Sequence, residues 1–207
     1  MNRIKAIIIS MVIILGIISL VHVDANAQQN NIKLSGPELS WVIVHPLIAV
    51  KAKRLSKRAL FVTDSIEKLG LLKDRSGGQL DAFKHAFWMA LLAQNIKPKK
   101  AYKLGKAHEK YNYNRARKGK GGGDQAASNM DLWNNDVGIK LGSENDNISE
   151  SALIELVINA IRKGKMKIIR KNLNGDSLDC DGQLIDKSTL KTWVNKRCLV
   201  ASNYEYN

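Results

Sequence analysis

The sequence predicts a mainly α-helical protein, a single compact domain of four to six helices with a short irregular or hairpin segment at its C-terminus. Three observations predict this class. Apolar residues recur at helical spacing in several segments before residue 163, and capping residues or proline stand where these segments begin. The turn-forming pairs Asn174-Gly175 and Asp181-Gly182 lie in the remainder of the chain. The length suits one domain with a sizeable core.

Start and stop signals divide the helical part into segments. Ser35 and Glu38 have the spacing of a capping box, so a helix should begin at residue 35. Pro46 must kink or restart that helix. The expected helices cover residues 35–66 with the break at Pro46, 79–94, 98–112, 126–141 and 147–163, with Asn147 and Glu150 capping the last and a mobile loop at 119–124.

The first 27 residues have the composition of a signal peptide. Arg3 and Lys5 precede an apolar run, and the small-x-small triplet Ala25-Asn26-Ala27 follows it. The alternative, a transmembrane anchor, needs about 20 apolar residues, and this run is shorter. We therefore expect cleavage after residue 27 and export to the periplasm or the cell exterior, without a remaining transmembrane anchor.

Cleavage would leave a flexible N-terminus, residues 28–34, before a single helical domain, residues 35–207. This domain contains both cysteines, Cys180 and Cys198. An isolated pair in an exported chain predicts one disulfide, which contributes about 3 kcal/mol on the loop-entropy model. The alternative is a pair of buried free thiols.

The formal net charge is +14, and three basic clusters supply most of it: residues 51–58, 97–120 and 162–171. Such an excess favours an anionic polymer or an anionic lipid surface as the partner. The alternative is a solvated surface that keeps the protein in solution. The sequence does not reveal which protein, if any, is a partner.

The expected helix 79–94 is apolar nearly all round, which predicts a central, buried helix. Opposite its broad apolar face, Asp81, His85 and Trp88 form a narrow stripe. Asp81 and His85 are one turn apart and can touch. A buried carboxylate without partners is costly, so another group must face it.

The next helix, 98–112, divides into two sides. One side carries the lysines Lys99, Lys100, Lys103, Lys106 and Lys110. The other side places His108 inward among small residues, with Glu109 at its flank. For a lone histidine, a hydrogen bond to a backbone carbonyl in the core would be the more ordinary explanation.

The helix 126–141 repeats the pattern. Asp131, Asn135 and Gly138 lie in a narrow stripe with Asn134 beside it, and apolar residues flank the stripe on both sides. A polar stripe between two apolar flanks is not a solvent face. Three neighbouring helices therefore each present an inward polar stripe, which favours one shared buried site over unrelated core contacts.

Three sequence blocks carry a resemblance to a known family. They are GGQLDAFKHAFW at residues 77–88, Ala107-His108-Glu109, and MDLWNNDVG at residues 130–138. Together they resemble domain-of-unknown-function family 6973, an uncharacterised bacterial family marked by GGxxDAxRHAxW, AHE and MDLxNNxxG blocks. The resemblance spans roughly residues 39–185. It implies no established activity, and Lys84 stands where the pattern has Arg.

The shared site has the composition of a hydrolase that uses a divalent metal or acid/base catalysis. The candidate catalytic residues are Asp81, His85, His108, Glu109, Asp131, Asn134 and Asn135. The candidate metal ligands are His85, His108 and Asp131, which would leave a position open for water. The candidate substrate contacts are Lys84, Trp88 and Asn112.

The basic surface points to an anionic substrate, such as a phosphodiester, a phospholipid or a charged envelope polymer. The alternative is a non-catalytic module that binds polyanions or the envelope through its lysine face. In that case the polar stripes would hold the helices in register, because a fully satisfied buried network can specify a unique core.

Overall fold

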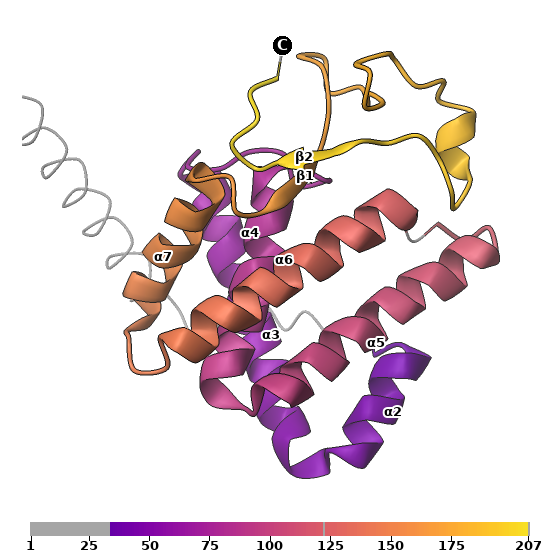
Figure 1. The fold of residues 1–207 in the computed structure, drawn as a ribbon. Coiled ribbons are helices and arrows are strands. Elements are labelled where there is room, and N and C mark those ends of the chain that lie inside the picture. The colour runs from indigo at the N-terminus through magenta and orange to yellow at the C-terminus, as the bar shows by residue number, and fades with distance from the viewer. Residues whose placement is uncertain (1–33, 122, 207) are drawn as a thin grey trace, which may run out of the picture.

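The computed structural model describes residues 34–121 and 123–206, and within them it confirms the mainly α class (Figure 1). The predicted signal peptide and nearly all of the predicted flexible N-terminus lie outside the described residues. Six α-helices, two short strands and one 3-10 turn follow one another in these parts of the chain. Among the described residues, no helix is both long and apolar enough to cross a membrane.

The first two helices form a corner, with α2 at Gly36–Val44 and α3 at Pro46–Lys68. The predicted capping box is present: the Ser35 hydroxyl accepts from the Glu38 amide, and the Glu38 carboxylate accepts from the Ser35 amide. Pro46 ends α2 and begins α3, since proline removes a backbone donor but suits a first helical turn. The break at Pro46 is confirmed.

The helix α4 (Gln79–Asn95) lies at the centre of the domain. It contacts α3, α5 (Pro98–Arg117), α6 (Gln125–Glu144) and α7 (Glu150–Arg162). Most of its side chains are buried, including the stacked pair Phe83 and Phe87. The prediction of a central, buried helix is confirmed.

Two glycines let α6 approach α4 closely. A Cβ atom added to Gly138 would lie 2.2 Å from the Ala86 carbonyl oxygen, and one added to Gly142 would lie 2.3 Å from that of Ala90. No other residue type fits at this separation without moving a backbone. The close approach also brings the preceding turns of α4 and α6, which carry the polar stripes, side by side.

Several predicted helix limits differ from the structure. The helix α5 continues to Arg117 rather than residue 112, and α6 covers 125–144 rather than 126–141. Arg115, Ala116 and Arg117 are good helix formers, and the two arginines favour the negative end of the helix dipole. The start of α7 was predicted from Asn147. Its cap is Ser149, whose hydroxyl accepts from the amide of Ala152.

The C-terminal segment closes one end of the helical domain (Figure 1). Strand β1 (Lys167–Ile169) pairs antiparallel with β2 (Leu199–Ala201), with a 3-10 turn at Thr189–Lys191 between them. The predicted disulfide joins Cys180 to Cys198. The expectation of an irregular or hairpin segment is confirmed, although the paired strands are not neighbours in sequence.

Candidate functional site

The first turn of α4 carries Asp81, and the residues before it hold this side chain in place. The Gly77 amide donates to Asp81 Oδ2 at 2.7 Å, from a glycine with φ of 83°. A left-handed backbone of this kind favours glycine. On the other oxygen, Lys84 Nζ lies 2.5 Å from Oδ1. Both oxygens of Asp81 therefore have a partner.

The predicted convergence of α4 and α6 is present. His85 Nε2 lies 3.3 Å from Asp131 Oδ2 and 3.8 Å from Asp81 Oδ1. One potential ligand atom from each of the three residues lies within 4.8 Å of the other two, and all three residues are buried. We call these three residues the Asp–His–Asp cluster.

Burial governs the protonation of this cluster. Burial lowers the pKa of His85 well below its usual 6.5, and the nearby Lys84 and His108 lower it further, while the Asn135 amide opposes the change. The ring is therefore neutral at neutral pH and has a lone pair to offer. Burial also raises the pKa of Asp131 well above 3.8, and the negative charges of Asp81 and Glu109 raise it further.

Several buried polar atoms around the cluster lack a hydrogen-bond partner. They are His85 Nδ1, Asp131 Oδ1, Glu109 Oε1 and both polar atoms of the Asn135 amide. Buried polar atoms in native proteins nearly always have a partner, and those that lack one call for an ion, a water or a ligand. Here they gather around the same three residues.

Glu109 is a further carboxylate, next to the Asp–His–Asp cluster but not part of it. Its Oε2 accepts from Ser128 Oγ at 2.9 Å and from Asn112 Nδ2 at 3.4 Å. Burial raises the pKa of Glu109 above 4.5, against the effect of these bonds and of His108. Asn112 therefore contacts Glu109, and no role beyond this contact follows from its position.

The burial of His108 and Glu109 is the reverse of the sequence prediction. Glu109 is buried, whereas about a third of the His108 side chain is exposed. The helix α5 packs between α2 and α6, so that Glu109 contacts Ser128 of α6 and His108 contacts Glu38 of α2. His108 nevertheless remains near the cluster, with its ring centroid 6.3 Å from that of His85.

A residue that the sequence analysis treated only as a cap belongs to the site. Glu38 Oε1 lies 2.8 Å from His108 Nδ1, while Oε2 accepts from the Ser35 amide. Burial alone would raise the pKa of Glu38, but the bonds from His108 and Ser35 outweigh it and lower the pKa to about 2. No local signal connects residues 38 and 108, because only folding brings α2 against α5.

A pocket of about 320 Å³ lies beside these residues. Its walls come from α2, α3, α4 and α5, and most of the lining is apolar, including Trp41, Val50 and Leu104. Among its polar lining residues are Lys53, Ser56 and the neighbouring residues Glu38, Lys84, His85 and His108. The pocket therefore combines an apolar space with ionisable groups near the Asp–His–Asp cluster.

Two other predicted site residues have different positions. Trp88 lines the pocket, donates from Nε1 to Ser56 Oγ at 2.8 Å and meets the His108 ring edge-on. Asn134 instead anchors the sheet: its amide donates to the Lys167 carbonyl and accepts from the Lys167 amide, both at 2.9 Å. Both ends of the Asn134 amide are thus bonded to the backbone of β1, which gives this residue a structural role.

The residues that could hold a metal ion differ from the predicted ligands at one position. The cluster contains His85 and Asp131, as expected, but its third residue is Asp81 and not His108. His108 uses Nδ1 to contact Glu38 and lies on the pocket side. Two carboxylates and one neutral imidazole suit Zn²⁺ or Mn²⁺, with further coordination positions open. The unpartnered atom Asp131 Oδ1 fits this composition.

Comparison with known protein families identifies the family of the chain. The model of the family described as Domain of unknown function (DUF6973) matches residues 39–165, which include all three sequence blocks of the site. The match ends before the disulfide segment, although the resemblance was expected to reach about residue 185. No curated protein and no solved structure matches the chain significantly.

Proposed function

The chain belongs to the DUF6973 family, and since that description specifies no reaction, we propose from the site itself that the protein is a hydrolase of an anionic amphiphile. The bond cleaved is a phosphodiester, as in the headgroup of a phospholipid. The observation that carries the proposal is the buried Asp–His–Asp cluster with its unpartnered atoms, directly beside a largely apolar pocket.

Asp81, His85 and Asp131 would hold a divalent cation. A cation at this position would act as a Lewis acid on the substrate and lower the pKa of a water. The raised pKa of Asp131 supports this role, because a cation would balance the carboxylates that burial and mutual repulsion disfavour. The neutral state of His85 supports it too, since a protonated ring has no lone pair to give.

His108 would act as the general base or acid. With Glu38 ionised, Nδ1 of His108 donates the hydrogen bond to Oε1, which leaves Nε2 with its lone pair. A carboxylate in this position fixes the tautomer and the orientation of the ring, as in other histidine–acid pairs. The ring lines the pocket and lies close enough to His85 for both to meet one substrate.

The pocket supports an amphiphilic substrate. Its apolar walls suit an acyl chain, and a few polar groups fix the orientation of the bound molecule, as in most ligand sites. Lys84 lines the same pocket and supplies the positive charge for a phosphate. The Lys84 ammonium group pairs with the Asp81 carboxylate. When a cation binds to Asp81, Lys84 would leave this carboxylate and contact the phosphate of the substrate instead.

The ion pair between Lys84 and Asp81 also favours a second candidate, a non-catalytic binding module. In that case Lys84 is the permanent counter-ion of the carboxylates, and the polar cluster stabilises the helix pair. The pocket would then bind an amphiphile without cleaving it. The two candidates differ in whether the cluster takes up a cation.

Titration calorimetry separates them. EDTA-treated protein should bind one Zn²⁺ or Mn²⁺, Asp131→Asn should lose this binding, and Asp136→Asn should retain it. Asp136 is the matched control because it lies on the exposed side of the same helix. A folded protein that binds neither cation would contradict the metal-dependent hydrolase and favour the binding module.

A second measurement tests the base. His108→Asn should slow hydrolysis of phosphatidylglycerol in detergent micelles by about 100-fold or more, the usual loss when a general base is removed. Cation binding by this variant should stay unchanged, because His108 is not part of the Asp–His–Asp cluster. Equal rates for His108→Asn and the unaltered protein would exclude His108 as the base.

A further inference from the structure

The corner between α2 and α3 exposes a group of large apolar side chains. Leu47 is 95% exposed, Val50 78%, Val44 70% and Ile43 69%. These four residues, which we call the α2–α3 corner, follow one another closely along the chain on either side of Pro46. A contiguous exposed apolar group of this kind marks an interaction site more often than a single exposed leucine does.

Positive charge surrounds the α2–α3 corner. Lys53 and Arg54 are exposed on the next turn of α3. Lys51 donates to the Asn95 carbonyl, which places the turn between α4 and α5, with its exposed Lys97, against the same region. Between residues 34 and 61 the one acidic residue is Glu38, and it faces inward to His108.

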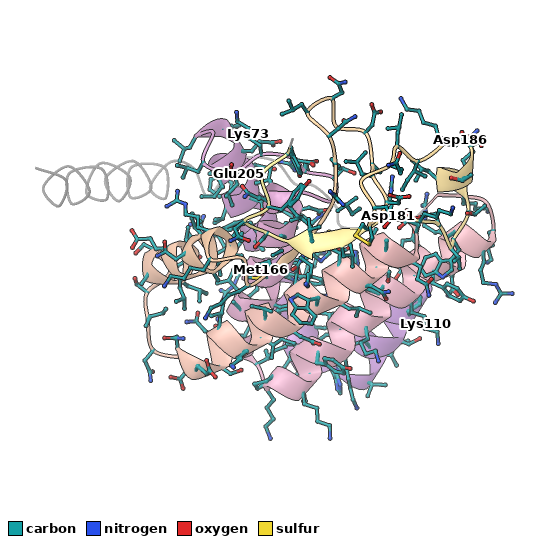
Figure 2. The ribbon with its side chains drawn as sticks, turned by 45° about the horizontal axis from the view of Figure 1, so that its top comes forward. Lys73, Lys110, Met166, Asp181, Asp186 and Glu205 are labelled. Carbon is teal, nitrogen blue, oxygen red and sulfur yellow. A yellow bond between two sulfur atoms is a disulfide. The ribbon has the colours of Figure 1, made fainter. Side chains whose placement is uncertain are left out.

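The far end of the molecule carries exposed charges of both signs, including Lys187 and Lys191. The C-terminal segment lies at the other end of the domain in Figure 1, and it presents exposed Asp181 and Asp186 (Figure 2). On α5, between the two ends, Lys110 is exposed (Figure 2). The apolar side chains thus lie at a basic end of the molecule, whereas the opposite end carries both basic and acidic groups.

We propose that the α2–α3 corner is a docking surface for an anionic lipid bilayer. Ile43, Val44, Leu47 and Val50 would enter the boundary between headgroups and acyl chains, while the surrounding lysine and arginine side chains contact the anionic headgroups. Apolar side chains together with basic residues are the composition of surfaces that lie on membranes without crossing them.

Charge decides against a second copy of the chain as the occupant. Two copies that met through this corner would bring Lys53, Arg54 and Lys97 of each into proximity with the same cations of the other, which is repulsive. An anionic bilayer instead neutralises these charges. Val50 also belongs to the pocket wall, so the docked corner would place the pocket next to the lipid chains.

Vesicle co-sedimentation tests the proposal, with the purified protein in EDTA so that no cation-dependent reaction alters the lipids. The protein should bind vesicles of phosphatidylcholine with about 30% phosphatidylglycerol, and bind pure phosphatidylcholine vesicles far less. Val44→Ser/Leu47→Ser should lower the partition coefficient about tenfold, because it removes two inserted apolar side chains.

The matched control is Leu173→Ser/Val194→Ser, which alters two equally exposed apolar residues of the C-terminal segment. This variant should bind as the unaltered protein does. Lys53→Gln/Arg54→Gln should lower binding to the anionic vesicles by about fivefold per charge removed. Since all six altered residues are exposed, folding should not change.

Three outcomes would overturn the proposal. The first is absence of binding to anionic vesicles by the unaltered protein. The second is equal binding by the corner variant and the control variant. The third is a dimer in sedimentation equilibrium that dissociates in Val44→Ser/Leu47→Ser, which would assign the corner to a second copy. The outcome is independent of hydrolysis, because these vesicles are tested without a divalent cation.

Discussion

Two buried aspartates, one that caps α6 and one two turns into the helix, have very different surroundings. Asp124 caps the helix and is 2% exposed, with every oxygen paired: Oδ1 accepts from the Ala127 amide, and Oδ2 from Asn195 and from Arg197 at 2.7 Å. Asp131, two turns later, has His85 at 3.3 Å and leaves Oδ1 without a partner.

The difference is the one expected between a structural carboxylate and the proposed cation ligand. Around Asp124 each carboxylate oxygen has a hydrogen-bond donor, and the bonds from Asn195 and Arg197 join the C-terminal segment to the start of α6. Around Asp131, burial and the carboxylates of Asp81 and Glu109 raise the pKa, and the positive charge of Lys84 opposes them only in part. The carboxylates around Asp131 do not stabilise the fold, since unpaired buried charge costs free energy. The proposed cation site would explain why these carboxylates lie together.

The largest expected effect comes from removing the satisfied carboxylate. Asp124→Ala should lower the free energy of unfolding by about 3–5 kcal/mol, because it leaves the Arg197 guanidinium without its partner and removes the cap of α6. Urea denaturation at neutral pH measures this. Asp181→Ala, in an exposed turn of the same segment, should change it by about 0.5 kcal/mol or less. A similar decrease in the free energy of unfolding in both variants would mean that the hydrogen bonds of Asp124 contribute no more to stability than an exposed turn residue does.

The change at Asp131 should have the opposite sign. Without divalent cation at pH 7.5, Asp131→Asn should raise the free energy of unfolding by about 1 kcal/mol, since it removes a buried carboxyl group whose ionised form burial, Asp81 and Glu109 disfavour. Thermal denaturation measures this against Asp136→Asn, which should change little. If Asp131→Asn destabilises the protein as strongly as Asp124→Ala does, the Asp–His–Asp cluster is structural and the comparison fails.

The smallest effect is a pH dependence at Glu38. Its pKa falls from 4.5 to about 2 in the folded protein, so its contribution is complete above pH 4.5 and disappears as the pH falls through about 2. Because the group is partly exposed, screening limits the contribution to about 0.5–1 kcal/mol. The difference in stability between the unaltered protein and Glu38→Gln should therefore be constant above pH 5 and shrink toward pH 2.

Acid denaturation curves followed by circular dichroism provide this measurement. Glu144→Gln, at the exposed end of α6, is the control and should parallel the unaltered protein. A Glu38→Gln difference that stays constant down to pH 2 would show that the contact with His108 does not stabilise the carboxylate.

The sequence predicted most residues of the candidate site. The contacts that it did not predict all depend on how the helices are rotated and packed against one another. Asp81, His85 and Asp131 came from helical periodicity, because a polar side chain on a helix that is otherwise apolar must face another polar group. Periodicity does not measure how far a helix rotates on its neighbours. Glu109 was therefore placed at the flank, and its burial against Ser128 was not expected.

Asn134 and Glu38 illustrate the same limit. Asn134 lies beside the polar stripe of α6, but its amide pairs with the backbone of Lys167, far along the chain. Glu38 has the spacing of a cap, performs that role, and uses its second oxygen for His108. In both cases the decisive partner comes from a segment that only tertiary packing brings near.

The sequence by itself determined the helical class, the break at Pro46, the central position of α4 and the cysteine pair, since each depends on local periodicity, backbone chemistry or composition. Tertiary structure alone decided which polar groups meet. Gly138 and Gly142 set the separation of α4 and α6, and that separation decides whether His85 reaches Asp131. Contacts between distant segments depend on a three-dimensional fit of surfaces, which no local pattern of residues encodes.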